Sequence, residues 1–207
     1  MKSEKMIVGC RFFLSILAFS AIITQFVTRA QIQPFNPINF FSFFTIGSNI
    51  LVAIILALSC FATAKFGRLE QFGVLRGAAT VYIFTTGLIY FLLLRGLEES
   101  LQTPIPWVNT VLHYIMPIAM ILDWVLNPPT KEIKWKHAVS WLLFPLLYVI
   151  YSLIRGSFID WYPYPFLDPR INGYDGVFVY SVGIALAIGV ICVLVKMLGN
   201  RSLKLKK

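Results

Sequence analysis

Three polar side chains interrupt the apolar run FFTIGSN, residues 43 to 49. Thr45, Ser48 and Asn49 are spaced three and four residues apart, so an α-helix would carry them on one face. Lipid would leave this stripe without hydrogen-bond partners, and we therefore expect it to point into a helical bundle. Such residues also bond to their own helix or join two helices, so the stripe is compatible with packing as well as with chemistry.

One of the two histidines, His113, lies in a second apolar stretch, TPIPWVNTVLHYIMP. Asn109 and Pro117 stand four residues to either side, so all three share about one helical face. Pro117 has no amide hydrogen for the His113 carbonyl, and a local kink is expected. An ionisable residue at membrane depth is costly and marks a candidate functional site. The other histidine, His137, is expected at the cytoplasmic surface.

Thr45 and His113 are predicted to lie at the same depth in the membrane. Thr45 follows Pro37 by eight residues, and His113 follows Pro106 by seven. Both are therefore on the order of 10 Å below the outer helix ends, at about 1.5 Å per residue. A hydroxyl becomes a nucleophile when a base takes its proton, and imidazole is the usual base. If the two helices are neighbours, Thr45 and His113 form a candidate nucleophile and base for attack on an ester.

Acyl transfer also requires hydrogen-bond donors for the developing oxyanion. Asn49, Asn109 and Ser48 are the candidates, either for this role or for orienting the histidine. The helices carry no carboxylate at the depth of His113. A tyrosine, an amide, a backbone carbonyl or a loop aspartate would have to hold its tautomer.

Further polar and aromatic residues are expected around a substrate cavity in the outer half of the protein. The candidates are Tyr148, Tyr151, Arg155 and Trp161. Trp161 belongs to the loop 156–175, which is either an interfacial aromatic belt with solvated acids or a lid over an outward-opening cavity. Thr85 and Thr86 can also face inward, and periodicity leaves open which of them does.

The composition is that of an integral membrane protein. Of 207 residues 58% are hydrophobic, and the mean hydropathy is +0.76. Six segments are long and apolar enough to span a bilayer, which predicts one all-α domain over 1–207, a six-helix bundle with helices at about 7–28, 38–64, 74–95, 105–127, 136–155 and 176–198. The first segment lacks a small-x-small cleavage site and is expected to remain as a spanning helix.

The net charge of +9 follows the membrane topology rather than a nucleic-acid site. Most Lys and Arg residues fall on one side of the six segments, which predicts that both termini are cytoplasmic. The residues on that side are Lys2, Lys5, Lys65, Arg68, Arg76, Lys131, Lys134, Lys136, Lys196, Arg201, Lys204, Lys206 and Lys207.

Asp123 is expected to serve structure rather than catalysis. It lies ten residues beyond His113, about 15 Å along a helix, and cannot orient that ring. We expect it to pair with Arg11 or Arg76. A metal site is not expected, because one histidine at depth without a paired His/Glu motif or a CxxC motif does not make one. No cofactor is expected.

In ordered motifs along essentially the whole chain, the sequence resembles a known family of membrane proteins. The stretches are FTIGSN, LHYIMPIAMILDW, FPLLYVIYSLIRG and WYPYPFLD. They look like the prokaryotic six-helix branch of the androgen-induced-gene and androgen-dependent TFPI-regulating protein family. The resemblance implies a threonine hydrolase of lipid metabolism, acting on fatty acid esters of hydroxy fatty acids or similar esters, with Thr45 as nucleophile and His113 as base. It also implies a bacterial inner membrane location.

Three functions are therefore considered. The first is an intramembrane esterase whose partners are an acyl-ester substrate and membrane lipids. The second is a non-catalytic protein that binds or transports a lipid or small amphipath, with His113 and Arg155 as polar anchors. The third is a structural protein in which the polar stripe only packs helices. The oligomeric state and the substrate are left open.

Overall fold

The computed structural model describes residues 2–66, 72–98 and 104–204. Regular structure in these ranges is entirely helical, without a strand. Arg68, Lys206 and Lys207, which entered the charge count, lie outside the described residues. Six helical spans are long and apolar enough to cross a bilayer, which confirms the predicted class: Glu4–Ala30, Phe44–Ala62, Gly73–Leu94, Pro106–Leu126, Trp135–Ile159 and Pro169–Arg201.

Several spans consist of more than one helical element. In chain order the elements are α1 (Lys2–Ala30), α2 (Pro37–Phe41), α3 (Phe44–Phe66), α4 (Gly73–Ile89), η1 (Tyr90–Leu94), α5 (Pro106–Thr110), η2 (Val111–Ile115), α6 (Met116–Leu126), α7 (Trp135–Ser140), α8 (Leu143–Ile159), η3 (Pro165–Leu167) and α9 (Pro169–Lys204). The elements η1 and η2 are π-helical, and η3 is a 3₁₀ turn.

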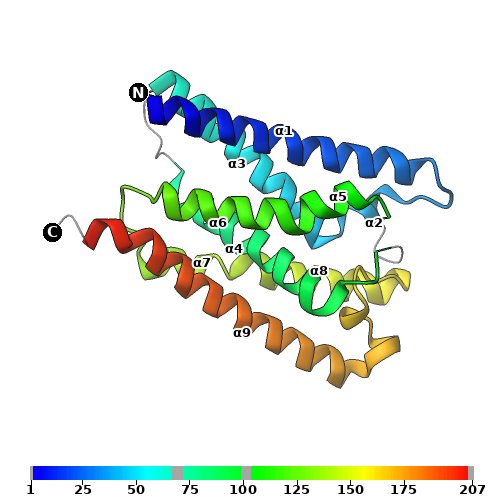
Figure 1. The fold of residues 1–207 in the computed structure, drawn as a ribbon. Helices are drawn as coiled ribbons and strands as arrows, with labels where there is room; N and C mark the ends of the chain where they lie inside the picture. Colours follow the sequence, from blue (N-terminus) through cyan, green and yellow to red (C-terminus); the bar gives the residue numbers. More distant parts are fainter. Residues whose placement is uncertain (1, 67–71, 99–103, 205–207) are drawn as a thin grey trace.

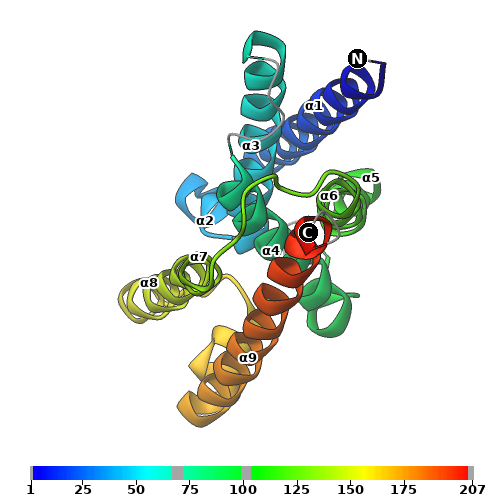
Figure 2. The same cartoon turned by 90° about the vertical axis from the view of Figure 1, so that its left-hand side faces the viewer.

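The spans run up and down, and both ends of the chain lie at the same end of the bundle (Figure 1). We call the opposite end, where α2, α5 and η3 lie, the site end. Helix α1 packs along α3, and α4 contacts α3, α6 and α9. Helices α7 and α8 stand apart from α1 and α6 when the bundle is viewed along its length (Figure 2).

The second predicted helix, 38–64, is broken into α2 and α3 at Ser42 and Phe43. Ser42 ends α2, and its hydroxyl donates to the Ile38 carbonyl at 2.7 Å. The Ser42 carbonyl does not continue the helix but accepts a hydrogen bond from the Tyr148 hydroxyl at 3.0 Å. The break places Thr45 in the first turn of α3, not within a continuous helix.

The fifth and sixth predicted helices also differ from expectation at their ends. The fifth, predicted at 136–155, begins at Trp135 and turns between α7 and α8. Pro145 follows this turn, and a proline is tolerated in the first turn of a helix but not in its interior. The sixth, predicted at 176–198, extends over α9 but is interrupted at Gly173, whose positive φ of 64° suits glycine.

Asp123 pairs with both predicted arginines rather than with one of them. Its carboxylate accepts from Arg11 Nε at 2.8 Å and Arg11 Nη2 at 3.1 Å, and from Arg76 Nη1 at 2.7 Å. Asn127 adds a bond to the same carboxylate at 3.2 Å. All three charged side chains are buried. The cluster ties α1, α4 and α6 together toward the end of the bundle that holds the chain termini.

Two π-helical turns lie at the site end, one in each of two packed helices. The η2 turn contains His113 and precedes Pro117. The amide of Met116, the residue that follows the turn, donates to the Val111 carbonyl. A proline that cannot donate within the α-helical pattern accounts for this irregularity. Gly87 packs against the turn: an added Cβ would lie 2.9 Å from the Pro117 ring and 3.0 Å from the His113 carbonyl oxygen. The kink expected at Pro117 is therefore a π turn against a glycine.

Candidate active site

The structure brings Thr45 and His113 together, which the sequence analysis had made conditional on their two helices being neighbours. Thr45 Oγ1 lies 3.3 Å from His113 Nε2, and both side chains are buried. Thr45 comes from the start of α3 and His113 from the π turn of the neighbouring span. The distance is at the long end for a hydrogen bond.

The backbone carbonyl of Asn109 decides which nitrogen of His113 carries the proton. His113 Nδ1 lies 3.2 Å from that oxygen. A carbonyl can only accept, so Nδ1 is the protonated nitrogen and Nε2 presents a lone pair to the threonine hydroxyl. Of the four kinds of orienting group left open by the sequence, the structure places a backbone carbonyl in this position.

Tyr90 fixes the plane of the histidine ring. The two rings stack with centroids 4.0 Å apart and an interplanar angle of 19°. The Tyr90 hydroxyl donates to Glu98 Oε1 at 2.5 Å and accepts from Asn109 Nδ2 at 2.6 Å. Asn109 therefore serves the site through its carbonyl, while its side-chain amide is engaged by Tyr90 rather than directed at Thr45.

Glu98 supplies a carboxylate near the site, although not in direct contact with the imidazole. It accepts from the Tyr90 hydroxyl and from the Gly96 amide at 3.0 Å. These two donors, the tyrosine first, lower the pKa of Glu98 from its ordinary value of 4.5 to about 2. The carboxylate is charged at neutral pH and holds Tyr90 against His113.

Ser48 and Asn49 hold the backbone of Thr45. Ser48 Oγ donates to the Thr45 carbonyl at 3.1 Å, and Asn49 Nδ2 donates to it at 2.9 Å. Ser48 also bonds to Thr86 on α4 at 2.8 Å, and Asn49 also donates to the Leu112 carbonyl at 3.3 Å. Both amide hydrogens of Asn49 are thus used, so the polar stripe anchors Thr45 to its neighbours and leaves the oxyanion to other donors.

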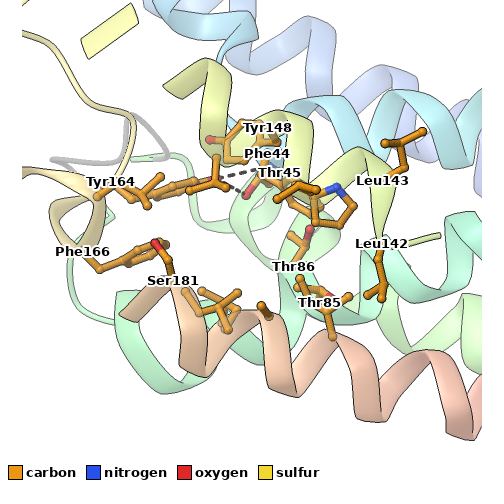
Figure 3. Close-up of a pocket in the computed structure, with 18 of the residues that line it drawn as sticks. Phe44, Thr45, Thr85, Thr86, Leu142, Leu143, Tyr148, Tyr164, Phe166 and Ser181 are labelled. Carbon is orange, nitrogen blue, oxygen red and sulfur yellow. Dashed lines mark hydrogen bonds between the residues drawn. The ribbon is translucent and has the colours of Figure 1, made fainter. Parts of the chain in front are cut away.

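Tyr164 is the donor nearest to the threonine hydroxyl. Its hydroxyl lies 3.4 Å from Thr45 Oγ1 and accepts from the Thr45 amide at 3.3 Å (Figure 3). Burial raises the pKa of the Tyr164 hydroxyl, which therefore stays protonated and able to donate. The Thr45 amide belongs to the first turn of α3, where no carbonyl of the same helix can accept from it. The Tyr164 hydroxyl is therefore the best-placed candidate oxyanion donor, and the Thr45 amide can join it only by releasing the Tyr164 oxygen.

A large apolar cavity of about 640 Å³ opens beside Thr45 (Figure 3). Its size is within the ~300–1,000 Å³ of small-molecule sites. Helices α3, α4, α7, α8 and α9 form its walls, and Tyr164, Phe166 and Leu167 of the segment before α9 line it at the site end. Both Thr85 and Thr86 line it, which resolves the question left by the sequence.

Of the four predicted cavity residues, only Tyr148 borders this cavity. Tyr151 instead bonds to Ser42 Oγ at 2.9 Å, and Arg155 Nη2 donates to Asn39 Oδ1 at 2.6 Å. The Arg155 guanidinium lies over the Trp161 ring, with Arg155 Cζ 5.2 Å from the ring centre. None of these three side chains lines this cavity, because Tyr151 and Arg155 are bonded to Ser42 and Asn39 at α2 and Trp161 stacks with Arg155.

The residues that sequence reasoning missed are Tyr90, Glu98 and the specific role of Tyr164. In the sequence, Tyr164 is only one of several aromatic residues in the loop 156–175. In the structure its ring packs against Phe43 and Phe166, with 5.6 and 5.1 Å between ring centres. An ionisable residue just beyond a predicted span, as Glu98 is, was the one signal available. Within the described ranges, no three His, Cys, Asp or Glu side chains gather as metal ligands.

In comparisons with known proteins, no family model, curated protein or solved structure matches this chain.

Proposed function

We propose that the protein is an intramembrane hydrolase of lipid-like esters, with Thr45 as nucleophile and His113 as general base. The observation that carries the proposal is the bond between Thr45 Oγ1 and His113 Nε2 at 3.3 Å, with Nδ1 held by a carbonyl. A threonine that served only to pack helices would need no imidazole lone pair. The resemblance to a family of threonine hydrolases supports the same two residues.

The geometry supports a two-step reaction. Thr45 Oγ1 attacks the ester carbonyl while His113 Nε2 takes its proton, and Tyr164 with the Thr45 amide binds the oxyanion. When the carbon–oxygen bond to the alcohol breaks, the imidazolium returns the proton to the leaving alcohol. Water then attacks the acyl-threonine by the same route, releasing the acid and restoring the Thr45 hydroxyl.

The large cavity supports an acyl chain as part of the substrate. Its lining extends from Thr45 and Tyr164 to Val139 and Ile188, nearly all of it carbon. A chain placed there would have its carbonyl at the nucleophile and its tail between α8 and α9. A chain that enters from water would gain about 0.8 kcal/mol for each buried methylene, whereas one that enters from the bilayer would gain little. Fatty acid esters of hydroxy fatty acids are the class that the family resemblance favours.

The charge distribution supports a topology with both termini in the cytoplasm, and the family resemblance supports a bacterial inner membrane. The site end would then lie in the outer leaflet, with water reaching it from outside. Lys2, Lys5 and Lys131 are among the cations that would flank the inner surface.

Purified protein in detergent tests the proposal. Thr45→Ala and His113→Ala should each abolish hydrolysis of a p-nitrophenyl acyl ester and labelling by a fluorophosphonate probe. Thr110→Ala and His137→Ala are matched controls, because Thr110 is exposed and bonds to its own helix, and His137 lies in α7. Full activity in Thr45→Ala or His113→Ala rejects the hydrolase.

The alternative is a protein that binds or carries a lipid without consuming it, which the size and apolar lining of the cavity favour. It predicts saturable binding of the same ester, no released alcohol, and unchanged binding in Thr45→Ala. Counting alcohol released per bound ester separates the two functions directly.

A further inference from the structure

A second, much smaller cavity lies on the other side of Thr45. Its volume is about 10 Å³, and its polar lining comes from Gln25, Thr45, His113 and Tyr164. Phe43, Ile46 and Leu94 complete it. Thr45 and Tyr164 border both cavities, whereas His113 borders only the small one. The proposed nucleophile therefore borders both the large apolar cavity and the small one, which is lined by four polar and three apolar side chains and includes the base.

The small cavity is suited to one water molecule. A water needs a space of roughly 10–15 Å³ and two to four polar partners. Four polar side chains supply these partners, and no larger nucleophile fits. Gln25 is the one of the four that has no part in the proposed acylation step. It lies within the α1 span, only 2% exposed, with Phe26 on one side and Thr24 on the other.

We propose that this cavity holds the water that hydrolyses the acyl-threonine and that Gln25 is its positioning residue. The inference rests on the proposed function. With the acyl chain in the large cavity, the ester carbonyl would sit at the wall that both cavities share. His113 Nε2 takes one proton from the water as its oxygen bonds to the carbonyl carbon. The bond to Thr45 Oγ1 then breaks, and the imidazolium returns that proton to the threonine.

Gln25 suits this role because an amide both donates and accepts hydrogen bonds. A water held by Gln25 on one side and by the imidazole on the other would have its lone pair free for the carbonyl. In the acylation step the imidazole faces the threonine hydroxyl instead, and no water is needed. Loss of Gln25 should therefore slow the second step and leave the first intact.

The experiment follows both steps with p-nitrophenyl octanoate as the probe. In Gln25→Met, which keeps the side-chain length but removes the amide, the initial burst of p-nitrophenol should persist. Steady-state turnover should fall about tenfold, the factor for one lost buried hydrogen bond. Intact-mass spectrometry should show an octanoyl adduct on Thr45. Gln31→Met, an exposed site just beyond α1, is the matched control.

A merely structural role for Gln25 gives a different result. Turnover would then fall together with the burst, without an adduct, and that outcome overturns the inference, as does unchanged turnover. Should Gln25→Met fail to fold, the wild-type protein decides: with ethanol added, an enclosed site for water yields free octanoic acid, and ethyl octanoate formed in proportion to ethanol overturns it. Turnover that survives in Thr45→Ala rejects the proposed function itself, whereas Thr45-dependent turnover with an unaffected Gln25→Met rejects only the water site.

Discussion

Two groups of buried polar side chains lie within the helical bundle, and they are built in opposite ways. The ion cluster of Arg11, Arg76 and Asp123 is charged and joined by bonds of 2.7 to 3.1 Å. The cluster of Thr45, His113 and Tyr164, which we call the catalytic cluster after its proposed role, is joined by contacts of 3.3 and 3.4 Å. The catalytic cluster also borders two cavities. There, hydrogen bonds between its members could be replaced by hydrogen bonds to a substrate.

The difference separates buried polar residues that hold a fold from those that do chemistry. A carboxylate that receives several short charge-assisted bonds is satisfied by them and gains little from a further ligand. Long bonds between neutral groups cost little to rearrange when a carbonyl arrives. If this distinction is right, substitutions in the catalytic cluster should lower activity and spare stability, and those in the ion cluster should do the reverse.

The largest effect is expected from His113→Gln. Losing the general base should lower kcat/KM by about 10²–10⁴, while the unfolding midpoint in detergent stays near that of the wild-type protein. Ester hydrolysis and thermal unfolding measured on the same preparation test this. A large loss of stability with unchanged activity per folded molecule would erase the distinction between the clusters.

Asp123→Asn should have the opposite signature. It leaves two guanidinium groups buried without a countercharge, at a cost of about 3–5 kcal/mol in the free energy of unfolding. Activity of the remaining folded protein should be unchanged, because this cluster lies far along the helix from His113. Denaturant titration, with activity normalised to folded protein, measures both quantities. An activity defect in fully folded Asp123→Asn would contradict the assignment.

Tyr164→Phe sharpens the comparison within the catalytic cluster. It removes the hydroxyl near Thr45 and keeps the ring that packs on Phe43 and Phe166. The kcat should fall about 10²–10³-fold, as for the loss of one oxyanion donor, with little change in KM. Tyr162→Phe is a suitable control in the same loop. Equal effects of the two substitutions would indicate a disturbed loop rather than a lost donor.

The smallest effect concerns pH and Glu98. Its pKa is lowered to about 2 in the folded protein, so its contribution to stability is complete above its ordinary pKa of 4.5 and is lost as the pH falls toward 2. Glu98→Gln keeps an acceptor for Tyr90 but removes the charge. The difference in unfolding midpoint between wild type and Glu98→Gln should be constant above about pH 5 and should shrink below pH 4.5. A difference independent of pH would show that the charge is immaterial.

Much of the candidate site could be predicted because membrane depth is encoded along the chain. Pro37 and Pro106 mark helix starts, and counting from them matched Thr45 with His113. The same reasoning paired Asp123 with the arginines. It could not predict the break at Ser42. The Ser42 carbonyl bonds to Tyr148, which is more than one hundred residues away, and local sequence does not specify such a contact.

The roles of individual donors were also beyond sequence reasoning. From the sequence, Asn49 is a reasonable oxyanion donor. In the structure its side-chain amide donates to the carbonyls of Thr45 and Leu112 instead. Tyr164 comes from a loop whose aromatic residues were as compatible with a membrane interface as with a lid. Hydrogen-bond partners more than a helical turn apart are set by helix packing, which a single sequence does not specify.

By itself, the sequence determined that the chain has six segments long and apolar enough to cross a membrane, and it predicted which polar groups share a depth, because hydropathy and helical rise act locally along the chain. Only the tertiary structure decided that Thr45 faces His113, that a carbonyl orients the ring, and that two unlike cavities meet at the hydroxyl. These features require side chains from different spans to share one space, and their contacts arise only when the helices pack.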